Sequence, residues 1–172
     1  MGYLGDGMKG VIASVALAVL PAWAGNALPV PAPKDVVLTI AGKVQSPNQG
    51  TEAVFSMAML TELPQTTFTT KQTWFPDKVV YTGPLLRDVL AAAGAKGTRI
   101  IAIALDGYKS ELPFDDAHQH NVILARLRDG KPMSIREKGP LFIVYPQLDK
   151  PELQSQMYNN RSVWQLKRLE VD

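Results

Sequence analysis

Residues 66–74 (TTFTTKQTW) carry hydroxyls, an amine and a tryptophan, and Thr69, Thr70 and Lys71 lie in their middle. β-Branched and aromatic residues favour extended structure, so we expect a strand here. Alternation along it would place Thr70 and Trp74 on one face and Thr69 and Lys71 on the other. Neither face is uniformly apolar, so packing alone does not account for the stretch. Lys71 could act as an electrostatic clamp or an amine nucleophile, although a solvated strand lysine is commoner.

Two further side chains could contact a ligand. Tyr108 follows the dipeptide Asp106-Gly107, a strong two-residue hairpin signal, and could present its hydroxyl there. The alternative is an aromatic half-buried in the hairpin. Arg161 follows a long polar loop, residues 147–160, and stands three residues before Trp164. A guanidinium in such a loop suits anion recognition, and the alternative is a surface arginine beside a packed tryptophan.

An acidic and histidine-rich segment, residues 115–120 (DDAHQH), offers oxygen and nitrogen atoms to a metal. On a strand, His118 and His120 would share a face and could bind one. If a helix starts here, Asp115 and Asp116 are instead a cap and a first-turn acid. We favour the helix start, because ligand identity without count and geometry is weak support for a metal site. We therefore expect no metal.

The composition restricts the chemistry further. The chain has no cysteine, which excludes thiolate metal sites, iron–sulfur clusters and cysteine nucleophiles. The formal net charge of +2 gives no argument for binding nucleic acid or a membrane surface. Glycine-rich phosphate loops, nucleophile-elbow serines and paired-histidine zinc motifs do not occur in the sequence.

The first residues have the character of an export signal. Residues 11–20 (VIASVALAVL) are an apolar run that Pro21 ends, and Ala22-Trp23-Ala24 fits the small-x-small cleavage rule. We expect residues 1–24 to be a cleaved signal peptide, with an uncleaved anchor as the alternative. Residues 25–34 form a proline-rich arm and residues 35–172 one domain of ordinary size. The mature protein would then be periplasmic and have no membrane span.

Strands and short helices alternate along the domain. We expect helices over residues 52–63 and 84–93, the second ended by Gly94. Residues 98–105 are a continuous apolar run, typical of a strand buried on both faces. The remaining expected strands cover residues 35–43, 108–112, 121–127, 141–145 and 163–171. This mixture predicts a mixed α/β or α+β domain.

The order of several short motifs resembles one known family. They are YTGPLLRDVL (residues 81–90), DGY (106–108), DGKP (129–132), GPL (139–141) and WQLKRLEV (164–171). In this order and spacing the chain is similar to the sulfite oxidase-type molybdopterin-binding domain, and in particular to small, stand-alone, exported members. The resemblance covers about residues 36–171. It implies an irregular α+β fold with mostly antiparallel sheets and a molybdopterin cofactor.

The resemblance also shows what this chain lacks. In catalytic members, a cysteine on a strand shortly before the helix of the YTG motif binds molybdenum, and here that place falls near Thr69, Thr70 and Lys71. A threonine hydroxyl is a poor substitute for a soft thiolate. The cofactor-binding residues that the resemblance and the local chemistry together suggest are Thr69, Thr70, Lys71, Trp74, Tyr108, Arg161, Trp164 and Lys167. The family's glycine- and arginine-rich pterin loops are not evident, and residues 147–160 occupy the corresponding position.

Three functions are compatible with these observations. The first is a non-catalytic module that binds a small anionic or pterin-like molecule, since fold and function separate readily. The second is a molybdenum oxidoreductase that holds its cofactor without a protein thiolate. The third is a scaffold that engages another periplasmic protein through the proline-rich arm or an exposed edge strand. We favour the first.

Overall fold

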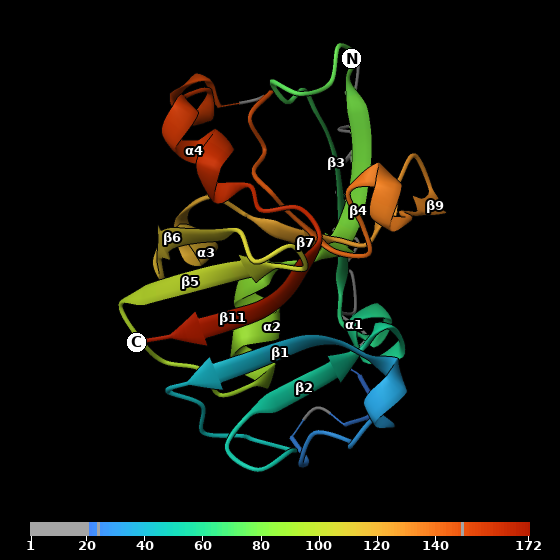
Figure 1. The fold of residues 1–172 in the computed structure, drawn as a ribbon, viewed down its shortest axis with the longest axis vertical. Coiled ribbons are helices and arrows are strands. Elements are labelled where there is room, and N and C mark those ends of the chain that lie inside the picture. The colour runs from blue at the N-terminus through green and yellow to red at the C-terminus, as the bar shows by residue number, and fades with distance from the viewer. Residues whose placement is uncertain (1–20, 24, 149) are drawn as a thin grey trace, which may run out of the picture.

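A five-stranded sheet forms the centre of the molecule (Figure 1). The computed structural model describes residues 21–23, 25–148 and 150–172. In spatial order the sheet consists of β2 (Ala53–Ser56), β1 (Val36–Gly42), β11 (Leu166–Val171), β5 (Arg99–Ala104) and β6 (Lys109–Pro113). β1 and β11 pair in parallel, whereas the pairs β1–β2, β11–β5 and β5–β6 are antiparallel.

Two smaller sheets lie beside the first. One contains β3 (Gln65–Thr70), β4 (Val79–Pro84), β8 (Leu127–Arg128) and β9 (Lys131–Pro132), and the other pairs β7 (Ile123–Ala125) with β10 (Phe142–Val144). All pairings in both are antiparallel. In Figure 1, β3 and β4 extend beyond the five-stranded sheet on one side of the molecule, and the helix α4 lies across from them. The expected α+β fold with mostly antiparallel sheets is confirmed.

The helices are short: α1 (Met57–Glu62), α2 (Leu86–Ala92), α3 (Asp116–Gln119) and α4 (Gln156–Arg161). α2 buries Leu86, Val89 and Leu90, which share one face because of their helical spacing. Gly94 has φ +61 directly after the C-cap, as a left-handed helix stop requires. No helix among the described residues is long and apolar enough to cross a membrane.

Several expected elements differ in the structure. The strand expected over residues 66–74 ends at Thr70, because the chain turns where the Phe75 N–H donates to the Gln72 carbonyl oxygen, so Trp74 does not continue the face of Thr70. The helix expected over residues 52–63 begins only at Met57, because β2 pairs with β1 before it. Ser56 ends that strand and caps the helix, with its hydroxyl accepting a hydrogen bond from the Met59 N–H at 3.3 Å. The polar loop of residues 147–160 contains all of α4 except its last residue, Arg161, and the amide-rich sequence of this helix has no apolar stripe to indicate it.

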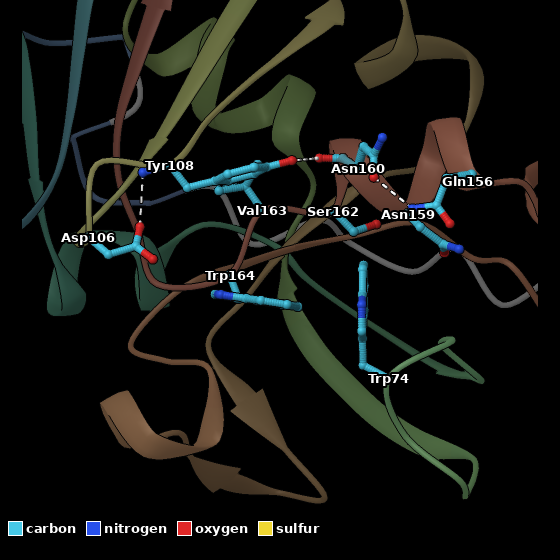
Figure 2. Close-up of a pocket in the computed structure, with 9 residues that line it drawn as sticks. All are labelled: Trp74, Asp106, Tyr108, Gln156, Asn159, Asn160, Ser162, Val163 and Trp164. Atoms are coloured by element: carbon cyan, nitrogen blue, oxygen red, sulfur yellow. Dashed lines mark hydrogen bonds between the residues drawn. The ribbon is translucent and has the colours of Figure 1, made fainter.

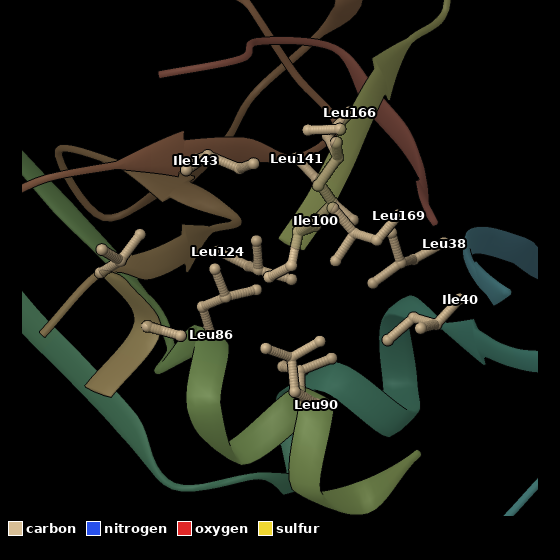
Figure 3. Packing of buried hydrophobic residues seen from close by; sticks show 14 of the residues in the cluster. Leu38, Ile40, Leu86, Leu90, Ile100, Leu124, Leu141, Ile143, Leu166 and Leu169 are labelled. Atoms are coloured by element: carbon tan, nitrogen blue, oxygen red, sulfur yellow. The ribbon is translucent and has the colours of Figure 1, made fainter. Parts of the chain in front are cut away.

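The main hydrophobic core lies between the five-stranded sheet and the helices α1 and α2. In Figure 3, Leu86 and Leu90 of α2 pack below Ile100, Leu124 and Leu169. A second cluster surrounds Tyr81 and Phe142, whose rings meet edge to face at 5.6 Å. The two cores are joined where β4 meets β7. Gly83 makes this approach possible, since a Cβ there would overlap the Leu124 carbonyl.

Residues on both sides of the predicted cleavage site contact the domain: Trp23 from the predicted signal peptide and Leu28 from the proline-rich arm. Leu28 is buried in the main core, and the partly buried Trp23 packs against the same cluster. The Trp23 carbonyl accepts a hydrogen bond from the Asn26 N–H at 2.9 Å. Residues 1–20 and Ala24, which make up most of the predicted signal peptide, lie outside the described residues. Cleavage after Ala24 therefore stays a prediction.

Candidate functional site

Three of the predicted site residues line one cavity of about 260 Å³ (Figure 2). Trp74 comes from the connection between β3 and β4, Tyr108 from the hairpin between β5 and β6, and Trp164 from the segment between α4 and β11. The two indole rings meet edge to face, with centroids 4.9 Å apart and planes at 81°. We call this cavity the aromatic pocket.

The opposite wall of the aromatic pocket is made of amides from α4. The Tyr108 hydroxyl donates to the Asn160 carbonyl oxygen at 3.2 Å, and the Gln156 Nε2 donates to the Asn160 Oδ1 at 2.8 Å. Asp106 accepts a hydrogen bond from the Tyr108 N–H at 2.9 Å. The O–H of Tyr108 is therefore used within the protein, and its oxygen can still accept a hydrogen bond.

A lysine outside the predicted set supports this pocket. The Lys138 Nζ lies 3.5 Å from the centroid of the Trp164 ring, within the range of a cation–π interaction. The contact restrains the ring and brings a positive charge close to the pocket. The position of the Lys138 side chain depends on its left-handed backbone conformation, with φ 79. No local sequence pattern predicts this conformation for a lysine.

A second cavity, of about 380 Å³, adjoins the first. We call it the amide pocket, and its lining residues are Lys71, Gln72, Thr73, Gln147, Leu148, Gln154 and Asn159. Asn159 lines both cavities. Its Oδ1 accepts from the Gln147 Nε2 at 3.0 Å, and its Nδ2 donates to the Thr73 Oγ1 at 2.7 Å. Asn159 is therefore a hydrogen-bonded partition between two adjacent cavities.

The two threonines of the predicted site have different surroundings. Thr69 is exposed on β3, opposite Val80 of β4. Thr70 ends β3 and is completely buried. Its hydroxyl oxygen accepts from the Gln147 N–H at 3.1 Å and lies 3.5 Å from the Tyr145 carbonyl oxygen. The Thr70 hydroxyl thus ties β3 to the segment after β10.

The two remaining predicted residues do not line either pocket. Arg161 directs its NH1 to the Asp116 Oδ2 at 3.0 Å, and both side chains are largely buried. Lys167 is exposed on β11 and borders a different hollow with Thr39 and Leu105. Arg161 therefore acts within the protein and anchors the end of α4, which carries one wall of the aromatic pocket.

The acidic and histidine-rich segment forms α3 and joins this anchor. Asp116 is 5% exposed and also accepts a hydrogen bond from the Tyr145 hydroxyl at 2.8 Å. Burial, and then the Asp116 carboxylate, raise the pKa of Tyr145 far above its ordinary value, so the hydroxyl remains a donor. His120 lies beside Tyr158, with 3.4 Å between its Nε2 and the hydroxyl. Within the described ranges, no group of three or more metal-binding side chains comes together.

Sequence reasoning missed the amides that line a large part of both pockets. Gln72, Gln147, Asn159 and Asn160 were not predicted as binding residues, although Gln72 lies inside the threonine-rich stretch. The available signal was composition, because residues 147–160 hold an unusual density of glutamine and asparagine. Their assembly depends on α4, whose existence the sequence pattern did not indicate.

The molybdenum centre that the resemblance implies does not fit these residues. The chain has no cysteine, and the Thr70 hydroxyl, near the expected ligand position, is used by main-chain groups. Neither pocket supplies the protein thiolate that the resemblance implies. A planar organic ring fits better, since Trp74, Tyr108 and Trp164 offer aromatic surface and the neighbouring amides offer hydrogen bonds.

Comparison with known proteins shows which family the chain belongs to. A solved structure, the sulfane dehydrogenase SoxCD from Paracoccus pantotrophus, superposes with a TM-score of 0.60 at 21% sequence identity. The match covers 85% of this chain and 40% of that one, so this chain spans less than half of the larger enzyme chain. A search of curated protein sequences gave no match. The profile of the oxidoreductase molybdopterin binding domain matches residues 27–171, and the chain therefore belongs to that family.

Proposed function

We propose that this protein is a non-catalytic member of its family that binds a small, planar, polar molecule in the aromatic pocket. One observation carries the proposal: Thr70, near the place where catalytic relatives hold a metal-binding cysteine, is buried with its hydroxyl engaged by the main chain. Metal catalysis requires ligands that fix the metal geometry and leave a position open. This chain keeps the domain and its cavity and lacks the thiolate.

The lining of the pockets supports a heterocycle as the ligand rather than a small inorganic anion. Trp74 and Trp164 provide surfaces on which a ring can pack, and Asn159 and Asn160 lie next to them. Arg161, the arginine predicted to bind an anion, is occupied by Asp116, so bidentate recognition of an anion by its guanidinium is not offered. The lysines at the pockets, Lys71 and Lys138, act as single point charges that can accompany a polar ring. A pterin-like compound combines the required ring with polar edges.

The protein is exported to the periplasm in this proposal. The support is the sequence of residues 1–24, with an apolar run followed by a cleavage-type tripeptide. A periplasmic binding protein without an active metal suits sensing or delivery of its ligand.

Two measurements on the protein purified from its native periplasm test the proposal. The first is molybdenum content together with pterin fluorescence after oxidative release. We expect no stoichiometric molybdenum. Near-equal molybdenum and pterin would instead show that the protein carries the complete cofactor, and the search would move to an unusual metal ligand.

The second measurement is a ligand titration followed by intrinsic fluorescence. A ring entering the aromatic pocket changes the surroundings of Trp74 and Trp164, so we expect a saturable change in emission. The variant Trp74→Phe should lose much of this response. Binding detected by calorimetry without any fluorescence change would place the ligand elsewhere and overturn the assignment of the site.

A further inference from the structure

The threonine-rich strand β3 forms one edge of the four-stranded sheet. Among the strands that the structure describes, it pairs only with β4, and the pairing keeps one register from Gln65 to Thr70 without a bulge. The six residues of β3, QTTFTT, include no charged residue and no proline. β3 is therefore a regular, uncharged edge strand.

The hydrogen bonds of β4 show which main-chain groups of β3 face outward. The Val80 N–H donates to the Asp129 Oδ1 at 3.0 Å, and the Val80 carbonyl oxygen accepts from the Asp129 N–H at 2.8 Å. The Thr82 carbonyl oxygen accepts from the Arg126 N–H at 2.9 Å. Val80 and Thr82 thus direct their main-chain groups away from β3. In an antiparallel ladder, the residues opposite them direct their own N–H and C=O groups away from β4.

The residues opposite Val80 and Thr82 are Thr69 and Thr67. Both are exposed, and in the described part of the chain no hydrogen bond from another segment reaches their main-chain groups. Their N–H and C=O groups alternate along the free edge as the ladder of a further strand requires. The outer edge of β3 is therefore ready to pair.

The other terminal strands of the two larger sheets carry features that hinder strand addition. On β2, the Asn48 carboxamide covers the Val54 main chain, because its Oδ1 accepts from the Val54 N–H at 2.7 Å and its Nδ2 donates to the carbonyl oxygen at 2.9 Å. β6 (KSELP) contains two charged residues and a proline, and β9 is only Lys131–Pro132. Charges, proline and short length are common means of protecting a sheet edge. β3 differs from these strands in having none of them.

We propose that β3 pairs with β3 of a second copy of this chain, antiparallel about a two-fold axis. Thr67 then lies opposite Thr69 of the second copy, and each such pair exchanges both of its N–H···O bonds. Phe68 meets its own counterpart at the axis, so two partly exposed rings lie side by side on the inner face of the joined sheet. The inference is independent of the proposed ligand binding.

The charges around β3 favour a second copy as the occupant. The side chains of β3 are neutral, so no like charges oppose each other across the axis. Lys71 follows the strand, and Glu62 ends α1 shortly before it. Antiparallel pairing brings Lys71 of each copy to the end where the other copy carries Glu62 and keeps the two lysines apart. A single strand pair buries less than the standard interface of about 1,600 Å², so we expect a weak dimer in the micromolar range or above.

Sedimentation velocity from about 1 µM to about 1 mM protein tests the proposal. We expect a concentration-dependent shift from monomer to dimer. The variant Thr67→Pro removes an outward N–H and leaves the ladder with β4 intact, so it should abolish the dimer. Its urea midpoint shows whether the fold is retained. Thr51→Lys, on an exposed turn away from β3, is a control and should dimerise like the unaltered protein.

Two charge variants at one exposed position identify the partner strand. In the proposed pairing, residue 69 and its counterpart are diagonal neighbours about 7–8 Å apart. Thr69→Lys and Thr69→Glu alone should each stay monomeric, because like charges meet across the axis. Mixed in equal amounts, the two variants should form a dimer at least about tenfold tighter than either alone, since opposite charges then meet.

Three results would overturn the inference. A protein that stays monomeric up to about 1 mM would leave the edge to an extended segment of a different protein. A dimer that persists in folded Thr67→Pro, or that forms equally well in Thr69→Lys alone, would place the contact on another surface. Folded, monomeric charge variants that do not associate when mixed would show that the partner strand is not an antiparallel β3.

Discussion

Replacing Arg161 by methionine separates a structural role from a role in ligand binding. The variant keeps the length of the side chain and removes the guanidinium that faces Asp116 at 3.0 Å. Asp116 would remain buried with the Tyr145 hydroxyl as its hydrogen-bond donor and with the His120 Nε2 at 4.0 Å from its Oδ1. We therefore expect a large loss of stability, because removing one member of a buried ion pair leaves a charge without compensation.

The magnitude follows from the burial of the pair. Breaking a fully buried ion pair costs about 3–5 kcal/mol. The Arg161 side chain is 17% exposed and that of Asp116 7%, so some solvent screening remains and we expect about 3 kcal/mol. For a domain of this size this corresponds to a fall in Tm of about 6–12 °C. Arg161 also lies 5.2 Å from the Tyr158 ring centroid, a contact that adds a smaller contribution.

Urea denaturation followed by circular dichroism measures the effect, and a double-mutant cycle with Asp116→Asn isolates the ion pair. In Asp116→Asn the arginine can turn toward solvent, so the single loss should be smaller, about 1–2 kcal/mol, and the two losses should not add. Arg136→Met, on an exposed 3₁₀ turn, is the control and should stay within about 0.5 kcal/mol. A loss below about 1 kcal/mol for Arg161→Met, together with collapse of ligand affinity, would refute the structural assignment and support the anion-binding role.

Three other predictions concern stability and export. Burial raises the pKa of Tyr81 from 10.0 to about 12, so its protonated form stabilises the fold below pH 10 and this contribution is lost as pH rises toward 12. Tyr81→Phe should flatten the alkaline loss of stability by up to about 1.4 kcal/mol per pH unit in pH-dependent urea titrations. Its neutral-pH stability should be equal or higher, because the buried hydroxyl has no partner among the described residues; a steeper alkaline loss would contradict this. Gly83→Ala should destabilise by about 3 kcal/mol or more in the same urea assay, since the added Cβ overlaps the Leu124 carbonyl, and a near-neutral effect would show that β4 and β7 can separate. If the predicted signal peptide is cleaved, N-terminal sequencing of protein purified from its native cells should begin at Gly25, and a start upstream of Trp23 would favour the uncleaved anchor.

The fold was largely accessible from the sequence because its strongest elements are governed by local patterns. The apolar run of residues 98–105 and the turn at Asp106-Gly107 predicted the β5–β6 hairpin, and the stripe on α2 predicted its buried face. The prediction of a helix over all of residues 52–63 was wrong, because the first part of this segment pairs with β1 as β2 despite its helical spacing of apolar residues. Pairing between strands that are distant in the sequence cannot be predicted from the pattern of a short segment alone.

The site was accessible only in part, for a related reason. Aromatic residues near turns and chain reversals were sensible candidates, and Trp74, Tyr108 and Trp164 do meet. The role of Arg161 depends on its contact with the Asp116 carboxylate, 45 positions away in the chain. No local sequence pattern predicts that this carboxylate is buried.

The position of β11 inside the five-stranded sheet has a consequence for the order of folding. β11 pairs with β1 on one side and with β5 on the other, so Gly42 meets Val171 across most of the chain length. The sheet cannot close until residues 166–171 have been synthesised, and contacts this distant in sequence slow folding. The pairing of β1 with β11 is therefore a late step of folding, and the two strands that flank β11 stay without their shared neighbour until it is in place.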